Sequence, residues 1–396
     1  MMLDRPSWLH PAFRLIEGGE GAGWSEFRWS DLAAMPQNPG GVVRADRASR
    51  VLAALAAAER AGVGLLLSRR DGAPRDWTAP PGFSVTLETS GTTGEPKRVR
   101  HDFNRLRGRL RGGPDEGARW LLAYEAGAFA GIQVILTAAF TGAALVSAPG
   151  GGVADLAQAA RRHAVTHVSG TPSFWRAFLM ALGSDVPPLT SITLGGEAVD
   201  QPLLDRLAAQ FPAARLRHIY ASTEAGAVFA VADKRAGFPV DWIEQGVDGV
   251  ALRLRDGVLE LRSPRAMLEG SGAVGDGWLN TGDLVERRGD RMEFVGRLDG
   301  LVNVGGVKVS PEAVERRLLT APGVADALVT AQANPITGFL LTALVVPVPN
   351  SDEAELRAAI RRVTADLVPA ARPRVITLTD RIPLGATGKK GRKAAS

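Results

Sequence analysis

Predicted strands and helices alternate along residues 62–220, and this alternation limits the folds open to the chain more than any other feature. Short apolar runs typical of buried strands are followed by longer Ala- and Leu-rich runs typical of helices. This pattern favours a mainly parallel sheet covered by helices. Ligands bind at the carboxyl ends of the strands in such sheets. We therefore expect the functional residues to follow strands. The strands are predicted at 62–67, 83–87, 120–124, 144–147, 166–169, 192–194 and 215–220, and the helices at 47–61, 129–140, 153–163, 172–182 and 201–210.

The rest of the 396-residue chain predicts two further regions. Residues 230–295 carry Asp-Gly and Gly-Asp pairs between short apolar runs, which indicates a β-rich segment with hairpins. After residue 298, Ser310-Pro311 and Ser351 each predict the start of a helix. We predict an α/β large domain with mainly parallel sheets and a β-rich segment over residues 1–298, and a small mobile α+β C-terminal domain over 299–396. Residues 1–45 are predicted to be irregular or to form short elements.

The composition excludes several classes of function. The chain has no cysteine, which excludes disulfides, thiolate metal ligands and a thioester on the protein itself. The net charge of +5 comes from 47 basic and 42 acidic residues that are scattered, whereas a nucleic-acid interface needs a concentrated basic patch. The five histidines lack metal-ligand spacing. No apolar run suits a membrane span or a signal peptide, so we expect a cytoplasmic protein without membrane partners.

Residues 87–97, Leu-Glu-Thr-Ser-Gly-Thr-Thr-Gly-Glu-Pro-Lys, follow the predicted strand at 83–87. Glycines allow backbone N–H groups to turn toward an anion, hydroxyl groups add neutral donors, and a lysine adds positive charge. These groups suit a polyphosphate, although the Walker spacing is absent. The alternative is an ordinary polar surface loop. The predicted phosphate contacts are Thr89, Ser90, Gly91, Thr92, Thr93, Gly94 and Lys97.

Four other segments accompany this loop. They are Tyr-Ala-Ser-Thr-Glu at 220–224, Trp-Leu-Asn-Thr-Gly-Asp at 278–283 in a predicted turn, Gly-Arg-Leu-Asp at 296–299 leading into 303–309, and Pro-Leu-Gly-Ala-Thr-Gly-Lys at 383–389. Each is a weak signal alone. Their order and spacing resemble the adenylate-forming (AMP-binding) superfamily of acyl- and aryl-CoA ligases, carrier-protein adenylation domains and luciferases. The resemblance covers residues 83–393, and relative to the family the large domain is N-terminally abbreviated.

The resemblance implies an acid–thiol ligase. Such an enzyme uses ATP and Mg²⁺ to convert a carboxylic acid into an acyl-adenylate, with release of pyrophosphate. A thiol of coenzyme A or of a carrier-protein phosphopantetheine then displaces AMP. We expect a small aryl or acyl acid as substrate and a monomeric or homodimeric protein. Two alternatives stay open: transfer to an amine or hydroxyl group, and a non-catalytic nucleotide-binding relative.

The resemblance also implies roles for single residues. Lys389 would supply positive charge between the acid and the α-phosphate, Thr223 would donate to that phosphate, and Glu224 would bind Mg²⁺. Asp283 and Arg297 would contact the ribose. The rest of the predicted nucleotide site is Gly195, Gly196 and Glu197 along the adenine, with Tyr220, Ala221 and Ser222.

Each of these assignments has a plainer alternative. Glu224 could be a surface carboxylate, Asp283 a turn residue, and Lys389 part of a basic tail that also includes Lys390. Lys308 could be a solvated strand residue, and we assign it no catalytic role.

Two reactions in one site require a change of geometry. In the family the small domain rotates between them, and Asp299, followed by Gly300, is the predicted hinge. Gly305 and Gly306 would then line the tunnel through which the thiol enters. The predicted acid pocket consists of Tyr124, Phe129, Ser169, His218 and Gly226, although a buried aromatic residue is more often plain core.

Overall fold

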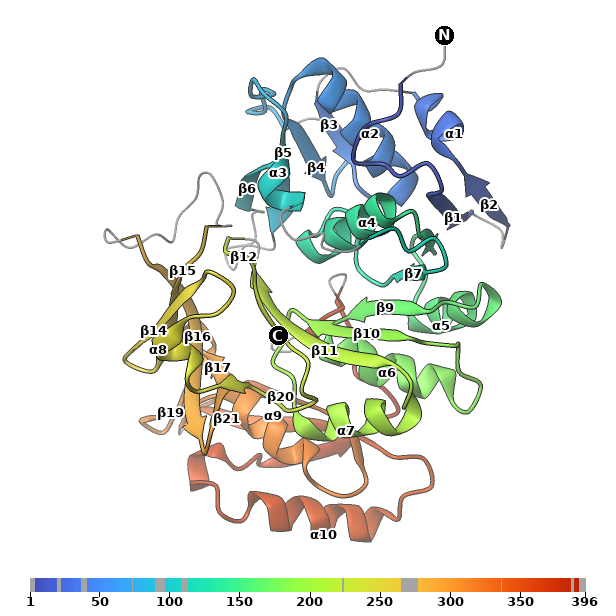
Figure 1. The fold of residues 1–396 in the computed structure, drawn as a ribbon. Coiled ribbons are helices and arrows are strands. Elements are labelled where there is room, and N and C mark those ends of the chain that lie inside the picture. Colours follow the sequence, from blue (N-terminus) through green and yellow to red (C-terminus); the bar gives the residue numbers. More distant parts are fainter. Residues whose placement is uncertain are drawn as a thin grey trace.

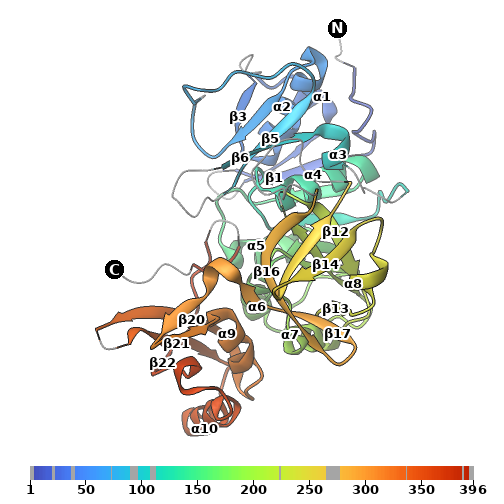
Figure 2. The same ribbon diagram turned by 90° about the vertical axis from the view of Figure 1, so that its left-hand side faces the viewer.

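The computed structural model describes residues 4–19, 23–36, 41–72, 74–89, 97–107, 113–222, 224–264, 277–335, 337–385 and 388–391. Figure 1 shows an N-terminal sheet at the top, a central sheet in the middle, an antiparallel sheet to the left and a small C-terminal domain at the bottom. The turned view in Figure 2 shows the small domain below the large one. The chain therefore has the predicted arrangement of an α/β large domain, a β-rich segment and a small α+β domain.

An eight-stranded sheet forms the centre of the large domain. Its strand order is β12-β11-β10-β9-β7-β8-β1-β2, in which β11 to β1 are parallel and the edge strands β12 and β2 are antiparallel. The strands are β1 (Arg14–Gly18), β2 (Trp24–Phe27), β7 (Arg119–Leu122), β8 (Ala144–Ser147), β9 (His167–Gly170), β10 (Ser191–Gly195), β11 (Arg215–Ser222) and β12 (Gly226–Val231). Because β9, β10 and β11 run parallel, their carboxyl ends lie along one edge.

Three helices cover one face of this sheet: α5 (Val153–Arg162), α6 (Pro172–Leu182) and α7 (Gln201–Gln210). Their apolar sides meet Val168, Ile192 and other strand residues in a buried core. The starts of α6 and α7 are well specified, because the Thr171 hydroxyl accepts from the Phe174 N–H and the Asp200 carboxylate accepts from the Leu203 N–H. These N-caps place both helix starts next to the carboxyl edge of the sheet.

A second sheet lies on the opposite side of the central sheet, and two helices are packed between the two sheets. It contains β3 (Val42–Arg44), β4 (Leu65–Ser68), β5 (Ser84–Thr89) and β6 (Lys97–Asp102). Between the sheets are α2 (Ala48–Ala61) and α4 (Phe129–Thr141), whose side chains share a core with both sheets. Two short helices, α1 (Trp29–Ala33) and α3 (Phe103–Arg107), complete this part.

The first turn of α4 depends on a glycine. A Cβ on Gly131 would lie 1.9 Å from the carbonyl oxygen of Glu125, so any side chain must push the backbone apart. We expect Gly131→Ala to lower the free energy of unfolding by about 3 kcal/mol, the upper part of the usual range for overpacking, because backbone atoms are displaced. Urea denaturation measures this loss. The control is Gly117→Ala, where no atom lies within 4 Å of a Cβ; equal losses in both variants would contradict the expectation.

The β-rich segment is a five-stranded antiparallel sheet with the order β13-β17-β16-β15-β14. Its elements are β13 (Phe238–Pro239), α8 (Trp242–Gln245), β14 (Ala251–Arg255), β15 (Val258–Arg262), β16 (Leu279–Arg288) and β17 (Arg291–Arg297). The predicted turn at 278–283 is wrong, because residues 279–283 belong to β16. Gly282 has φ of +72°, yet pairing with β15 and β17 keeps this segment in the sheet.

The small domain contains a hairpin of β20 (Val324–Asn334) and β21 (Gly338–Pro347), with β22 (Val375–Leu378) parallel to β21. Two helices, α9 (Pro311–Leu319) and α10 (Glu353–Thr364), pack on this sheet around a separate core. The remaining elements are η1 (Leu298–Gly300), the hairpin β18 (Val302–Val304) and β19 (Val307–Val309), and η2 (Pro369–Ala371). The boundary between residues 298 and 299 stays a prediction.

Most predicted elements of the large domain are confirmed, including α6, α7 and β8. The N-cap of α10 is Asp352, which accepts from the Glu355 N–H, whereas Ser351 was predicted. Residues 1–45 provide β1, an interior strand of the central sheet, which their Gly-rich composition obscured. Among the described residues, no helix is long and apolar enough to cross a membrane.

Candidate active site

Lys389 lies at the carboxyl edge of the central sheet although the small domain carries it. A Cβ placed on Gly196 would be 3.5 Å from Lys389 Cε and 3.9 Å from its Nζ. The neighbouring Gly388 carbonyl accepts a hydrogen bond from the Thr171 hydroxyl, which belongs to the β9–α6 connection. The loop is closed on itself by the Gly385 N–H, which donates to the Lys389 carbonyl over 2.7 Å. The C-terminal loop is therefore seated on the large domain.

A second cluster of polar side chains surrounds Asp283 of β16, near the end of β11. The Tyr220 hydroxyl donates to Asp283 Oδ2 over 2.5 Å, and Arg297 Nη1 donates to Oδ1 over 3.3 Å. Burial raises the pKa of the Asp283 carboxyl, while the bond from Tyr220 and the charges of Arg297 and Lys389 oppose that rise. Burial and the neighbouring Asp283 charge raise the pKa of Tyr220 well above its ordinary value, which keeps the hydroxyl protonated as a donor.

The structure thus brings the predicted base, ribose and lysine residues together. Gly195 ends β10 beside Ile219 of β11, and Gly196 has φ of +81°, a conformation that favours glycine. The Glu197 Oε2 atom accepts from the Ser173 N–H at the start of α6 over 3.0 Å. Ala221 and Ser222 end β11, and the Ser222 hydroxyl accepts from the Ala225 N–H. The edge therefore combines backbone groups, the carboxylates of Asp283 and Glu197, and the cations Lys389 and Arg297.

Part of the predicted phosphate site lies outside the described residues. These positions are Ser90, Gly91, Thr92, Thr93, Gly94 and Thr223. The flanking residues Thr89 and Lys97 pair at the ends of β5 and β6, so a β-hairpin carries the loop. Glu224 is half-buried and lies two residues beyond the end of β11. Among the described residues there is no group of three or more His, Cys, Asp or Glu side chains that could hold a metal.

The predicted acid pocket is brought together only in part. Tyr124 follows β7, and burial raises the pKa of its hydroxyl, while the side chain of Ser169 on β9 opposes that rise. Phe129 begins α4, and its ring lies near that of His101 with centroids 5.8 Å apart. Gly226 pairs with Ser222 at the turn between β11 and β12.

His218 lies on the other face of the central sheet. Ser169 pairs with Thr193 and Thr193 with Arg217, so these three side chains share a face that the next residue, His218, cannot share. Its Nε2 atom contacts the Arg235 carbonyl at 2.9 Å, and burial lowers its pKa. The structure therefore does not place His218 with Ser169, because the sequence-based grouping ignored strand alternation.

Asp299 lies in η1 between β17 and β18, and its carboxylate accepts from Arg297 Nε over 2.9 Å. Gly305 and Gly306 form the turn of the β18–β19 hairpin with φ of +59° and +88°. The roles of hinge and thiol tunnel stay predictions.

Sequence reasoning missed Thr171. This residue caps α6 and also donates to the Gly388 carbonyl, so it links a helix start to the lysine-bearing loop. The signal was available, since Thr-Pro-Ser follows a predicted parallel strand as the other site segments do.

Comparisons with known proteins identify the family of this chain. Residues 43–258 match the AMP-binding enzyme family, and residues 313–389 match the AMP-binding enzyme C-terminal domain. The first match spans more than half of the 396 residues. The chain belongs to the AMP-binding enzyme family of adenylate-forming ligases and synthetases.

Two curated relatives and one solved structure illustrate the similarity. The chain is 28% identical to the phosphinothricin tripeptide synthetase PhsB of Streptomyces viridochromogenes over 80% of this chain and 30% of that protein. It is 26% identical to the 2-succinylbenzoate–CoA ligase of Bacillus velezensis over 73% of this chain and 64% of that protein. The structure of E. coli MenE with bound OSB-AMS has a TM-score of 0.67 at 18% identity, covering 92% of each chain. That last likeness concerns the fold alone.

Proposed function

We propose that this chain activates a carboxylic acid with ATP and then transfers the acyl group to a thiol. The acid's carboxylate oxygen attacks the α-phosphorus, the bond to the β-phosphate oxygen breaks, and pyrophosphate leaves. The thiol sulfur of coenzyme A or of a carrier-protein phosphopantetheine then attacks the acyl carbon, and AMP leaves. The observation that carries this proposal is the position of Lys389 against Gly196, beside the Asp283 cluster.

The residues present fit the charge changes of adenylation. Negative charge builds on the phosphoryl oxygens in the transition state, and a fixed ammonium group there lowers the barrier. Lys389 supplies that group. The hydrogen bond from the Thr171 hydroxyl to the carbonyl of the neighbouring Gly388 holds the lysine in place. Asp283, whose ionised form Tyr220 and Arg297 stabilise, accepts from the ribose hydroxyls. Gly196 permits close approach of the nucleotide to the backbone.

Mg²⁺ fits this site as an ion held mostly by substrate. It keeps several waters and usually takes one or two carboxylates together with substrate phosphates. A single carboxylate, Glu224, follows β11 at the correct edge, and the described residues form no larger metal cage. Bound there, Mg²⁺ would offset the charge of the phosphates, while Thr223 and the loop from Thr89 to Lys97 would contact them.

The acid is proposed to be a small aryl or acyl acid. Tyr124, Ser169 and Phe129 offer aromatic surface and two hydroxyl groups near the carboxyl end of β9. One relative is a ligase for 2-succinylbenzoate by its name, and another is a peptide synthetase. Those names support a thiol acceptor of either kind, coenzyme A or a carrier.

Acid-dependent exchange of pyrophosphate into ATP tests the proposal. We expect exchange that requires Mg²⁺ and at least one member of a panel of aryl and short acyl acids. Coenzyme A and a phosphopantetheinyl carrier are then added separately, and mass spectrometry identifies the thioester. Absence of exchange across the panel would contradict adenylation, and adenylate formed without a product from either thiol would favour an amine or hydroxyl acceptor.

Tyr220→Phe tests the state of Asp283. The tyrosine hydroxyl stabilises the ionised carboxylate, so its removal raises the pKa of Asp283 further. At a given acidic pH a smaller fraction of Asp283 can then accept from ribose. We expect the acid limb of the kcat/KM profile for ATP to move to higher pH, with the loss greatest at low pH. An acid limb that does not move would contradict the contact between Asp283 and ribose.

A further inference from the structure

A network of buried charges lies beside Lys389 and joins three parts of the chain. Lys390 Nζ donates to Asp326 Oδ1 over 2.7 Å and to the Ala327 carbonyl over 2.5 Å, and Glu315 Oε2 lies 3.9 Å away. The Lys390 side chain is 5% exposed and that of Asp326 is 3% exposed. Lys389 and Lys390 therefore point to different places, the first to the active site and the second into the small domain.

Asp326 is also paired with the large domain. Arg176 Nε of α6 lies 3.6 Å from Asp326 Oδ1, and Arg176 Nη2 pairs with Asp200, the N-cap of α7. The Arg176 side chain is 6% exposed. One carboxylate oxygen thus faces a cation from each domain. In a poorly solvated place, removing one partner leaves an uncompensated charge, and such losses are large.

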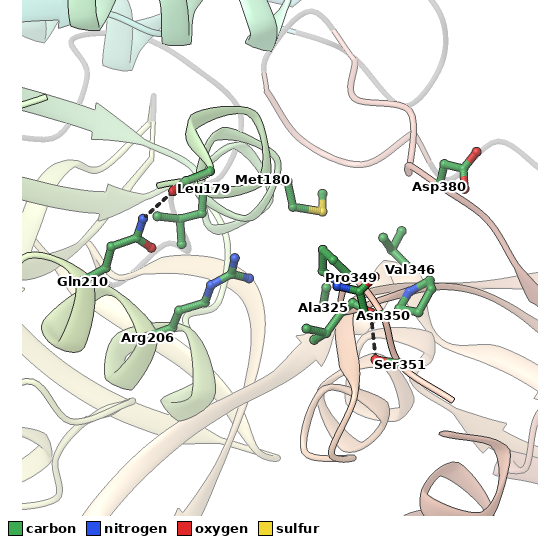
Figure 3. Close-up of a pocket in the computed structure, with 13 residues that line it drawn as sticks. Leu179, Met180, Arg206, Gln210, Ala325, Val346, Pro349, Asn350, Ser351 and Asp380 are labelled. Carbon is green, nitrogen blue, oxygen red and sulfur yellow. Dashed lines mark hydrogen bonds between the residues drawn. The ribbon is translucent and has the colours of Figure 1, made fainter. Parts of the chain in front are cut away.

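The rest of the interface on this side is not tightly packed. Met180 of α6 contacts a small apolar group that includes Leu328 and Ile382 of the small domain. Next to it lies a cavity of about 400 Å³ between α6 and α7 on one side and the segment after β21 on the other. Figure 3 shows Arg206 and Gln210 facing Pro349 and Asn350 across this gap. Besides this apolar group, the charge pairs of Arg176 and Asp326 are therefore a main contact between the domains on this side.

We infer that Arg176, Asp326 and Lys390 are positioning residues that hold Lys389 against the large domain for adenylation. Lys390 fixes the backbone of its neighbour Lys389 to the small domain, and Arg176 fixes Asp326 to the large domain. Rotation of the small domain separates Arg176 from Asp326 but leaves Lys390 paired with Asp326. The network thus favours the first half-reaction over the second. This inference rests on the proposed two-step function.

Three variants test the network: Arg176→Met, Asp326→Asn and Lys390→Met. Each is expected to lower kcat of pyrophosphate exchange about tenfold or more, with KM for ATP and acid within about twofold, because the arrangement that brings in Lys389 is less populated. Transfer to thiol from a synthetic acyl-adenylate is expected to stay within about twofold of wild type. Arg176→Lys is expected to recover part of the exchange rate. The control is Asp366→Asn, which removes an exposed ion pair with Arg317 inside the small domain.

Amide hydrogen exchange of residues 384–391 gives a readout that is independent of activity. We expect faster exchange of this segment in Arg176→Met and Asp326→Asn than in wild type and Asp366→Asn. Equal losses in both half-reactions, or rates and hydrogen exchange that match those of Asp366→Asn, would overturn the inference. If wild type exchanges no pyrophosphate with any acid, the proposed function fails, and hydrogen exchange alone then decides whether the network holds the loop.

Discussion

Lys389→Ala is expected to lower kcat for acid-dependent pyrophosphate exchange by about a hundredfold or more, corresponding to roughly 3 kcal/mol of transition-state stabilisation. The ammonium group lies at the edge where Gly196, Thr171 and the Asp283 cluster meet. Its charge matters most when negative charge builds on the α-phosphate, so KM for ATP should change much less than kcat. Steady-state exchange kinetics at saturating acid measure both constants.

Transfer from a synthetic acyl-adenylate separates the two half-reactions of the Lys389→Ala variant. We expect this step to stay close to wild type, because the proposed rotation of the small domain would take the lysine-bearing loop out of the site before transfer. Lys308→Ala is the control, since Lys308 is exposed on β19 and has no assigned role. If Lys389→Ala loses no more exchange activity than Lys308→Ala does, Lys389 is not the adenylation lysine.

Asp299→Pro is expected to have the second largest effect, on thioester formation. Asp299 lies in the first turn of η1, where proline is tolerated, so the observed arrangement should persist. Proline fixes φ near −65°, so a rotation of the small domain that needs another value of φ at this residue is hindered. We therefore expect pyrophosphate exchange to continue while thioester formation falls by about a hundredfold.

The matched control for this variant is Asp299→Ala. Alanine also removes the hydrogen bond from Arg297 but leaves φ free to change. Comparison of the two variants isolates the effect of the fixed torsion angle. If Asp299→Pro loses exchange as severely as thioester formation, or if Asp299→Ala loses thioester formation equally, the hinge does not lie at this residue.

Much of the fold was predictable because local signals and tertiary packing agree. The helix α6 begins at Pro172 after a threonine N-cap and ends before Gly183, as its sequence predicts. The segment at 278–283 shows where local signals fail. Its Asn-Thr-Gly-Asp residues favour a turn, but neighbours on both sides hold it in β16. Long-range pairing cannot be read from such a short segment.

The site was predictable where its residues lie in recognisable sequence motifs. It was less predictable where the position of a residue depends on the face of a strand or on contacts between distant segments. Asp283, Tyr220 and Lys389 were assigned from motifs, and the structure brings them together. His218 was misplaced because two adjacent strand residues point to opposite faces. The pairing of Lys390 with Asp326 was invisible in the sequence, where Lys390 looked like part of a basic tail.

A crystal structure with bound ATP shows whether this edge of the sheet binds the nucleotide for adenylation. We expect both ribose hydroxyls within about 3.2 Å of the Asp283 carboxylate, and Lys389 Nζ at a similar distance from an α-phosphate oxygen. The adenine is predicted to lie along Gly195–Glu197. A nucleotide bound elsewhere, or bound here with Asp283 away from the sugar and Lys389 away from the α-phosphate, would contradict the assignment of this edge as the adenylation site.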